Sequence, residues 1–554
     1  MSLILFVLCV NPLSHLLNDT EGYLIGEPNQ RDTNISHLLF VDDLKTFAKN
    51  EQMALKQLDI ITTFTNDIGM KFGADKCAYL NIERGQRTLL NKKIVVNGLE
   101  LSELEDGDSY KYLGMDEDVQ YQGRLNKENV TKEYYRRVRK IWSSELYSKN
   151  KVLAFNSFAI PVLTPTFGIL EWTKEEILQI DVKTRKLLTV TGNFHRNSSV
   201  DRLYTTRQKG GRGLNSAFDV FLARMISLAR HIDTIASTNV YIKEVRRHEQ
   251  DRLIRISVEL CNAFEITNAD GEPKAVADEV RTKMKNNHAE ACRTKPQHGY
   301  IERNQLNNPD VNVDLTHGWL KANIPSHVEG YITAIQEQEI RTRDLQKKRE
   351  HPDNNAFNNN CRYCNTQKED IFHILASCNH LSASLYLPVR HDEVGKVLMN
   401  AIVRQEHPDH NYISPSNEVW NSDTVDIWWD TVVKTCPPVK HNKPDLVVWR
   451  KRKKICFVID VCVPLDQNIQ KNEKLRQDRY VALTVGLKRI YPEYTYTIVP
   501  IVLGATGLVT NSLVKNLTTL GFDKKDISSL VCKLQTKALV GSMRIMKSAM
   551  TLKT

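Results

Sequence analysis

The amino-acid sequence predicts a multidomain α+β protein. Its 554 residues exceed what one compact core holds, so about three or four folding units are expected. Short apolar runs separated by turn residues fill residues 1–80, and helical periodicity dominates residues 125–190. Strands rich in β-branched residues, flanked by charged turns, begin near Val439. These changes of pattern predict α+β material first, then a helical middle, then an α/β domain.

Charge and cysteine content restrict the partners and the compartment. The net charge of +10 favours a polyanionic partner. Eleven cysteines, an odd number that is widely spaced, indicate reduced thiols in the nucleus or cytoplasm. The apolar residues 1–10 have no basic segment before them and no cleavage site after them, and no run approaches the roughly 20 apolar residues that span a bilayer. We therefore expect no membrane partner, and a buried helix at residues 1–10.

Three cysteines and a histidine give the strongest single signal. Cys361, Cys364, His373 and Cys378 have the spacing C-x2-C-x8-H-x4-C, which can close a tetrahedral Zn²⁺ site. Because protein atoms fill all four positions, the predicted zinc is structural. Chance clustering is the alternative, and the reducing compartment disfavours a disulfide. We expect a zinc knuckle that fixes a linker and contacts nucleic acid.

Two adjacent acids, Asp42 and Asp43, follow an apolar run and precede a second short one. A hairpin with a tight turn would project both carboxylates, and hard oxygen ligands suit a pair of Mg²⁺ ions for phosphoryl transfer. On the residues alone, an ordinary Asp-Asp turn is the simpler interpretation.

A second acid pair lies near the C-terminus. Asp445 precedes a short apolar strand, Asp460 lies inside another, and fourteen residues separate them, which suits two antiparallel strands that bring both acids to one end. An acid inside so apolar a strand needs a partner, and Mg²⁺ is a suitable one. On the following helix, Lys474, or Lys471 one turn earlier, would orient the attacking water or stabilise the phosphorane charge. Five basic residues at 450–454 indicate a DNA contact, a nuclear address or, most simply, a solvated hairpin tip.

The glycine-rich residues 210–213 lack the Lys-Ser/Thr ending of a phosphate loop, so a turn with positive φ is predicted there. Four arginines lie before or within this segment: Arg185, Arg202, Arg207 and Arg212. Each is a solvated surface charge on its own, and a phosphate contact if the region binds nucleic acid.

Four segments, in order, resemble the reverse transcriptase of non-LTR retrotransposons. Residues 40–43 resemble its catalytic hairpin, residues 69–77 its next motif with Lys76 as the lysine, and residues 110–115 its primer-grip hairpin. Residues 2–14 resemble the helix after its template-contacting Gln-Gly. The resemblance implies that Asp42 and Asp43 bind catalytic Mg²⁺. The family's third catalytic aspartate lies upstream of the segment that matches Ser2, so we expect a partial palm that does not polymerise DNA.

The rest of the chain resembles later parts of the same polyproteins. Residues 151–214 resemble the thumb, and the Cys/His spacing recurs in the family between polymerase and endonuclease. Residues 443–474 resemble a PD-(D/E)xK restriction-like endonuclease, in which Asp445 and Asp460 are the acids. Cys462 replaces the usual lysine, and Lys474 best matches the lysine that the retrotransposon branch takes from the next helix.

The resemblance implies an RNA-directed DNA polymerase with DNA endonuclease activity, used for target-primed reverse transcription. Its partners are DNA and RNA, and its cofactors are Mg²⁺ and structural Zn²⁺. A non-enzymatic nucleic-acid-binding relic is the alternative function, and a partial gene model of a complete element is a third interpretation. The expected domains are a partial reverse-transcriptase palm (1–120), a thumb-like helical region (121–240), a helical linker (241–350), the CCHC zinc knuckle (351–400) and the restriction-like endonuclease (401–554).

Overall fold

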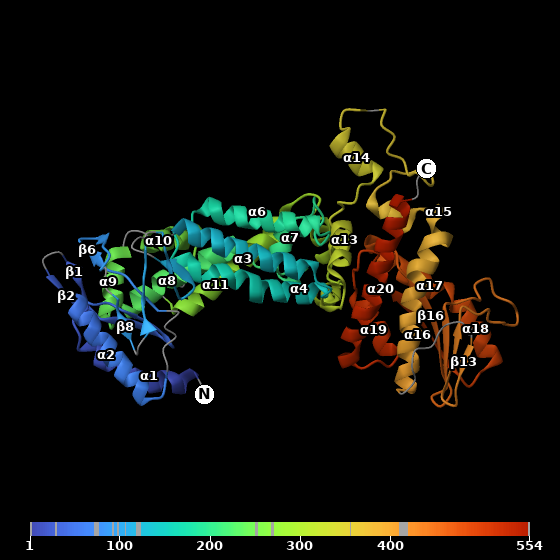
Figure 1. The fold of residues 1–554 in the computed structure, drawn as a ribbon. Coiled ribbons are helices and arrows are strands. Elements are labelled where there is room, and N and C mark those ends of the chain that lie inside the picture. Colours follow the sequence, from blue (N-terminus) through green and yellow to red (C-terminus); the bar gives the residue numbers. More distant parts are fainter. Residues whose placement is uncertain are drawn as a thin grey trace. The chain divides into compact units, whose positions relative to one another are not determined.

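The computed structural model shows a mixed α/β multidomain protein (Figure 1). It describes residues 3–27, 30–70, 77–90, 93–96, 99–105, 107–117, 123–249, 253–266, 271–354, 356–408 and 419–551. Within these ranges, no helix has both the length and the apolar character required to cross a membrane. The chain forms two compact units, each discontinuous in sequence: Met1–Arg136, Pro161–Ile180 and Ala217–Arg281 in unit 1, and Arg137–Ile160, Asp181–Ser216 and Thr282–Thr554 in unit 2.

Unit 1 begins with small two-stranded sheets and two long helices. Asn50 caps the second helix by accepting a hydrogen bond from the Met53 N–H. The helices are α1 (Leu3–Asn18) and α2 (Glu51–Asp67). The hairpins are β1–β2 (Tyr23–Glu27, Gln30–Ile35), β3–β4 (His37–Phe40, Asp43–Thr46), β6–β7 (Ile82–Glu83, Gln86–Arg87), β8–β9 (Val95–Val96, Leu99–Glu100) and β11–β12 (Tyr110–Tyr112, Met115–Glu117), and β5 (Ala78–Tyr79) pairs parallel with β10 (Ser102–Glu103).

The apolar N-terminal segment forms a helix, but the expectation that it is buried is wrong for much of its surface. α1 buries Val10, Leu13 and Leu17 against α2. Leu3 and Ile4 are 63% and 72% exposed. A helix that packs against one neighbour buries one stripe at spacings of three and four, so the residues on its other face stay in solvent.

The middle of the chain is helical, as its periodicity predicts. Its helices are α3 (Gly123–Ser143), α4 (Ser148–Ala154), η2 (Phe155–Ala159), α5 (Ile160–Leu163), η3 (Thr164–Gly168), α6 (Lys174–Val190), α7 (Val200–Tyr204), η4 (Arg207–Lys209), α8 (Ala217–Ile235), α9 (Val240–Glu249), α10 (Leu253–Ala263) and α11 (Pro273–Thr294). Helices continue through η5 (Glu302–Leu306), α12 (Val313–Thr316), η6 (Gly318–Lys321), α13 (Ser326–Gln336) and α14 (Arg343–Glu350).

Unit 2 ends in a five-stranded sheet in the order β13-β14-β15-β16-β17. Its strands pair antiparallel, except that β16 and β17 are parallel and α17 and α18 connect them. The elements are η7 (His373–Ser377), α15 (Asn379–Leu381), η8 (Ser382–His391), α16 (Asp392–Glu406), β13 (Val419–Asn421), β14 (Val425–Trp429), β15 (Leu446–Arg450), β16 (Ile455–Cys462), η9 (Asp466–Asn468), α17 (Ile469–Arg479), α18 (Val481–Ile490), β17 (Thr495–Val502), α19 (Asn511–Thr519) and α20 (Lys524–Thr551).

Alternate residues of β15 are buried on opposite faces of this sheet. Leu446 and Val448 join a core that also contains residues of α16 and α20, whereas Val447 and Trp449 join one that contains residues of α18. Figure 1 shows α16 and α20 on one side of the sheet and α18 on the other. The first core is one cluster of buried side chains that come from positions between Trp319 and Ala549, and it includes Cys361 and Cys378. The segments expected as linker end, knuckle and endonuclease therefore share one core.

Candidate metal centres

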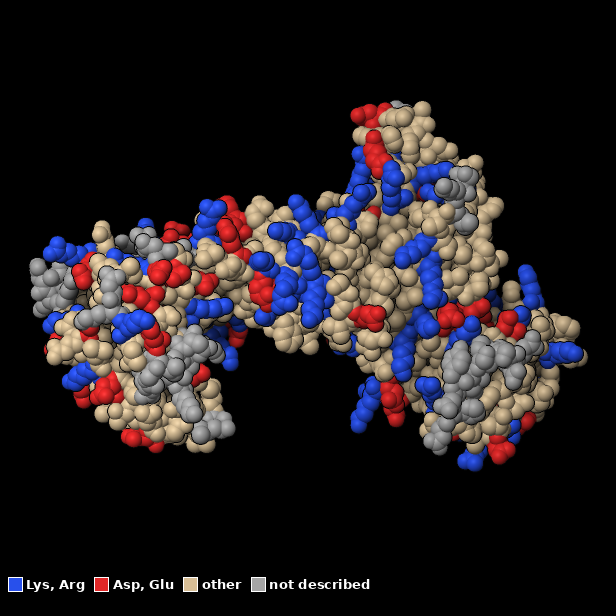
Figure 2. Space-filling model, in the orientation of Figure 1, with Lys and Arg blue, Asp and Glu red and all other residues tan. Residues whose placement is uncertain are grey.

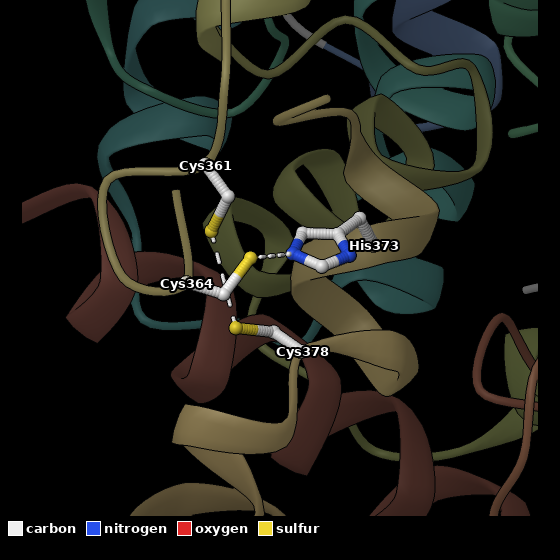
Figure 3. Close-up of side chains that lie close together, drawn as sticks. All are labelled: Cys361, Cys364, His373 and Cys378. Carbon is white, nitrogen blue, oxygen red and sulfur yellow. Dashed lines mark hydrogen bonds between the residues drawn. The ribbon is translucent and has the colours of Figure 1, made fainter. Parts of the chain in front are cut away.

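The four residues of the Cys/His motif converge in unit 2. His373 begins η7, and Cys378 lies between η7 and α15 (Figure 3). One potential ligand atom from each of the four residues lies within 4.8 Å of the others. The Sγ atoms of Cys361 and Cys378 are 3.9 Å apart, close to the separation of about 3.8 Å expected for two thiolates bound to one tetrahedral zinc. This Cys/His centre can hold a metal ion.

Backbone and side-chain hydrogen bonds fix the loops of the Cys/His centre. Asp370 accepts a hydrogen bond from the His373 N–H at 2.7 Å, and Glu369 pairs with Arg362 at 2.8 Å. Burial opposes ionisation of Cys364, but hydrogen bonds from Thr366 lower the pKa of its thiol to about 6. Burial, and then the charge of Cys361, raise the pKa of Cys378. Metal binding should therefore release a proton from the Cys378 thiol.

Asp445 and Asp460 meet at one end of β15 and β16. The antiparallel register pairs Leu446 with Ile459, so the next step places Asp445 opposite Asp460, as the fourteen-residue spacing predicts. Asp460 is 2% exposed. The Asp445 Oδ2 atom accepts a hydrogen bond from the Val461 N–H at 2.6 Å. The side chain of Asp445 keeps 19% of its surface exposed, so Asp460 is the buried member of this acid pair and Asp445 the partly exposed one.

Asp460 has protein partners that the sequence interpretation did not assign to it. Arg476 Nη1 lies 2.5 Å from Asp460 Oδ2, and the Tyr480 hydroxyl donates to Asp460 Oδ1 at 2.8 Å. Burial and the charge of Asp445 raise the pKa of Asp460, against the effects of Arg476 and Tyr480. A carboxyl group whose pKa is shifted by burial and by a nearby like charge is typical of functional sites.

Asp445 also has a partner from a distant part of the chain. His391, the last residue of η8, lies with Nε2 3.2 Å from Asp445 Oδ2 and 3.1 Å from the Val461 carbonyl. Its Nδ1 lies 3.0 Å from Asp392. Burial alone would lower the pKa of His391, but hydrogen bonds to Asp392 and Asp445 raise it to about 10.

The helix after the acid pair presents Arg476, not Lys474, to Asp460. Arg476 of α17 and Tyr480, the residue that follows α17, are four residues apart and both contact Asp460. Lys474 and Lys471 are exposed, and within the described residues neither forms an ion pair with Asp445 or Asp460. A role for Lys474 in cleavage stays a prediction. The four-residue spacing of Arg476 and Tyr480 was the sequence signal that could have indicated them.

The N-terminal acids lie at a tight turn. β3 and β4 form a hairpin whose two-residue loop is Val41 and Asp42, with Val41 at φ +60°. Asp42 and Asp43 are exposed. A β-branched residue with positive φ is strained, and such strain is concentrated at functional sites. Residues 71–76, which include Lys76, lie outside the described residues, as does Ser2.

The primer-grip-like hairpin lies beside this turn. Lys45 of β4 pairs with Glu117 of β12 at 2.5 Å, and its ammonium group lies 5.3 Å from the centroid of the Tyr112 ring. Burial, and then the charge of Asp43, raise the pKa of Tyr112. The two hairpins are therefore neighbours.

The prediction that Arg212 is a solvated surface charge or a phosphate contact is wrong, and Arg207 is half-buried rather than fully solvated. Arg212 is 1% exposed, and its Nε lies 2.9 Å from Glu329, which Arg207 approaches to 2.5 Å. Arg202 binds Gln336, and Arg185 donates to the Tyr204 hydroxyl. A buried guanidinium needs an anionic partner, and α13 supplies it.

The glycine-rich turn after α7 does have positive φ, +76° at Gly210 and +81° at Gly213, as predicted. Arg450, expected at a solvated hairpin tip, is buried and pairs with Glu406 at 3.1 Å. In the part of the chain that the structure describes, the Cys/His centre is the one group of three or more His, Cys, Asp or Glu residues close enough to hold a metal. No protein-family model matches the chain, and no curated protein matches it.

Proposed function

We propose that the chain is a retrotransposon-derived Mg²⁺-dependent DNA endonuclease, with the acid pair as its cation site and a structural Zn²⁺ at the Cys/His centre. The observation that carries this proposal is the acid pair, in which partly exposed Asp445 lies opposite buried Asp460 at one end of two adjacent antiparallel strands. Three thiols and an imidazole are the donors that zinc prefers, whereas two carboxylates suit Mg²⁺.

The acid pair supports cation binding in a specific way. The Oδ1 atom of Asp445 accepts no hydrogen bond from any described residue, so it is available to a cation. Both oxygens of Asp460 are engaged, by Arg476 and Tyr480. Each of these oxygens has a second lone pair that a cation could use, and Arg476, if it is released from Asp460, could hold a substrate phosphate through its paired N–H groups. When bound, Mg²⁺ would polarise the scissile phosphate and activate water.

Nucleic acid is the proposed partner. Figure 2 shows Lys and Arg side chains gathered on one face over the helical region around α4 and α7. The net charge of +10 has the sign that a phosphate backbone attracts. The N-terminal hairpins with Asp42 and Asp43 are proposed to be part of a reverse-transcriptase palm.

A second candidate function is supported by the ion pair of Asp460. Arg476 already neutralises this carboxylate at 2.5 Å, as a metal ion would. The alternative is therefore a non-enzymatic nucleic-acid-binding relic of a retroelement, in which an Arg–Asp pair stabilises the sheet where the ancestor bound a cation.

Nicking of supercoiled plasmid by the purified, zinc-loaded chain in Mg²⁺ distinguishes the two functions. We expect nicking that Asp460→Asn abolishes. Asp426→Asn is the matched control, because Asp426 lies in the same sheet and pairs with Lys451 at 2.8 Å. If the wild type binds DNA and does not nick it, the binding function is correct. If Asp460→Asn nicks like the wild type, the acid pair is not the catalytic centre.

A further inference from the structure

One short segment connects the Cys/His centre with the acid pair. Cys378 is a ligand of the first, His391 contacts Asp445 of the second, and η8 (Ser382–His391) lies between them. Neither the sequence pattern nor the proposed cleavage chemistry assigns a role to this segment. Residues of η8 contact the Cys/His centre on one side and the acid pair on the other.

Tyr386 holds the metal-binding loop. Its hydroxyl accepts a hydrogen bond from the Cys378 N–H at 3.1 Å and lies 2.8 Å from the Ile374 carbonyl and 3.3 Å from the His373 carbonyl. One hydroxyl on η8 thus touches the backbone of two of the four ligands. Tyr386 therefore joins η8 directly to the loop that carries these two residues.

Arg390 connects Tyr386 to the end of β16. Its guanidinium lies 5.3 Å from the centroid of the Tyr386 ring, and Nη2 donates to the Val463 carbonyl at 3.2 Å. Arg390 is 2% exposed and has no ion pair with any described residue, which is costly for a buried cation. α20 approaches it so closely that a Cβ at Gly541 would lie 2.7 Å from the Arg390 Cβ. The folded chain holds Arg390 at this place in spite of the free-energy cost of burying its charge.

His391 fixes the acid pair itself. Its three neighbours are acceptors, the Asp445 and Asp392 carboxylates and the Val461 carbonyl, so both ring nitrogens donate. The Asp445 Oδ2 atom that faces His391 also accepts the Val461 N–H at 2.6 Å. His391 thereby bridges the start of β15 and the end of β16 where the two acids meet.

We propose that Arg390 and His391 are positioning residues through which the Cys/His centre holds Asp445 opposite Asp460. A bound metal would hold residues 373–378 in the conformation that the structure shows. Tyr386 contacts this loop, and η8 places Arg390 and His391 against the strand ends. Groups that orient a metal ligand in this way typically change metal affinity by about 10–100-fold. The part of this inference that concerns cation affinity rests on the proposed function. The coupling between the Cys/His centre and the acid pair concerns atoms that are in contact in the structure.

Hydrogen-exchange mass spectrometry of the full zinc-loaded chain tests the coupling without nuclease activity. The reporter is the peptide over residues 455–464, which contains the Val461 amide. We expect at least about ten-fold faster exchange there in Tyr386→Phe and in His391→Gln. Tyr496→Phe is the matched control, since the Tyr496 hydroxyl also donates to backbone carbonyls, of Leu487 and Tyr491.

Tyr386→Phe keeps all four metal ligands and the ring below Arg390, so zinc content and the exchange of β13 and β14 should stay at wild-type values. Wild-type exchange over residues 455–464 in both η8 variants would overturn the proposal. Faster exchange throughout the sheet would overturn it too, because the effect would then be general destabilisation.

Mn²⁺ binding, followed by electron paramagnetic resonance, separates this inference from the proposed function. We expect His391→Gln to weaken Mn²⁺ binding about ten-fold, and Asp460→Asn to abolish it. A wild-type chain that binds no Mn²⁺ but shows coupled exchange would refute the endonuclease and support the coupling. Unchanged Mn²⁺ affinity in His391→Gln would refute a positioning role for His391.

Discussion

The two acid pairs of the chain differ in how they are built. Asp42 and Asp43 are neighbours in sequence at an exposed turn, where water satisfies their charges. Asp445 and Asp460 meet at one end of two adjacent strands, where Asp460 is buried and Asp445 is partly exposed. Since burial of carboxylates is costly, the second pair requires dedicated partners, which α17 and η8 supply.

This difference shows which acid pair carries the stronger argument for function. An Asp-Asp turn forms wherever a short loop needs polar residues, so its presence requires no ligand. Two acids held together inside a sheet lower stability unless something offsets their repulsion. The predictions below test this contrast, in order of decreasing effect.

The largest effect is expected at the ion pair of the buried acids. Arg476→Met leaves the Asp460 carboxylate buried without its cation and should destabilise unit 2 by about 2–3 kcal/mol at neutral pH. Lys474→Met, on the exposed face of the same helix, should change stability by less than about 0.5 kcal/mol. Hydrogen exchange of β15 and β16 in increasing urea measures both. Equal losses would mean that the contrast between the two faces of α17 is wrong.

The pH dependence of stability should depend on Asp460. Its pKa is raised in the folded state above the value of 3.8, so the folded chain binds this proton more tightly than the unfolded chain. Its contribution to stability is therefore fully present below about pH 4 and is lost as the pH rises through the folded pKa. Asp460→Asn should flatten the decline of the melting temperature over this window, and Asp426→Asn should not. A parallel decline in wild type and Asp460→Asn would contradict the raised pKa.

The contrast also shows which residues could be predicted from sequence. The Cys/His ligands lie within eighteen positions of one another, so local turns bring them together and spacing alone predicted them. Asp445 and Asp460 were predictable because one hairpin joins them. His391 lies 54 residues before Asp445, and only the folded core, with η8 packed between α16 and α20, brings the two together.

The second limit on prediction from the sequence was the direction in which a helical side chain points. The resemblance favoured Lys474 on the helix after β16, whereas the residue of α17 that contacts Asp460 is Arg476. The arginines after α7 show the same limit, since Arg212 resembles a phosphate ligand in sequence and is a buried partner of Glu329 in the fold. Charge was visible in the sequence, whereas its burial depended on α13, more than one hundred residues away.

The smallest effect is expected at the exposed pair. Asp42→Asn and Asp43→Asn, alone or together, should change stability by less than about 0.5 kcal/mol, because water solvates these carboxylates in the folded and unfolded states alike. Mg²⁺-dependent nicking should also be unchanged, since the proposed cleavage uses Asp445 and Asp460. The assay is plasmid nicking beside a thermal melt. A double variant that lost nicking would place the cation site at the N-terminal hairpin and reverse the ranking of the two acid pairs.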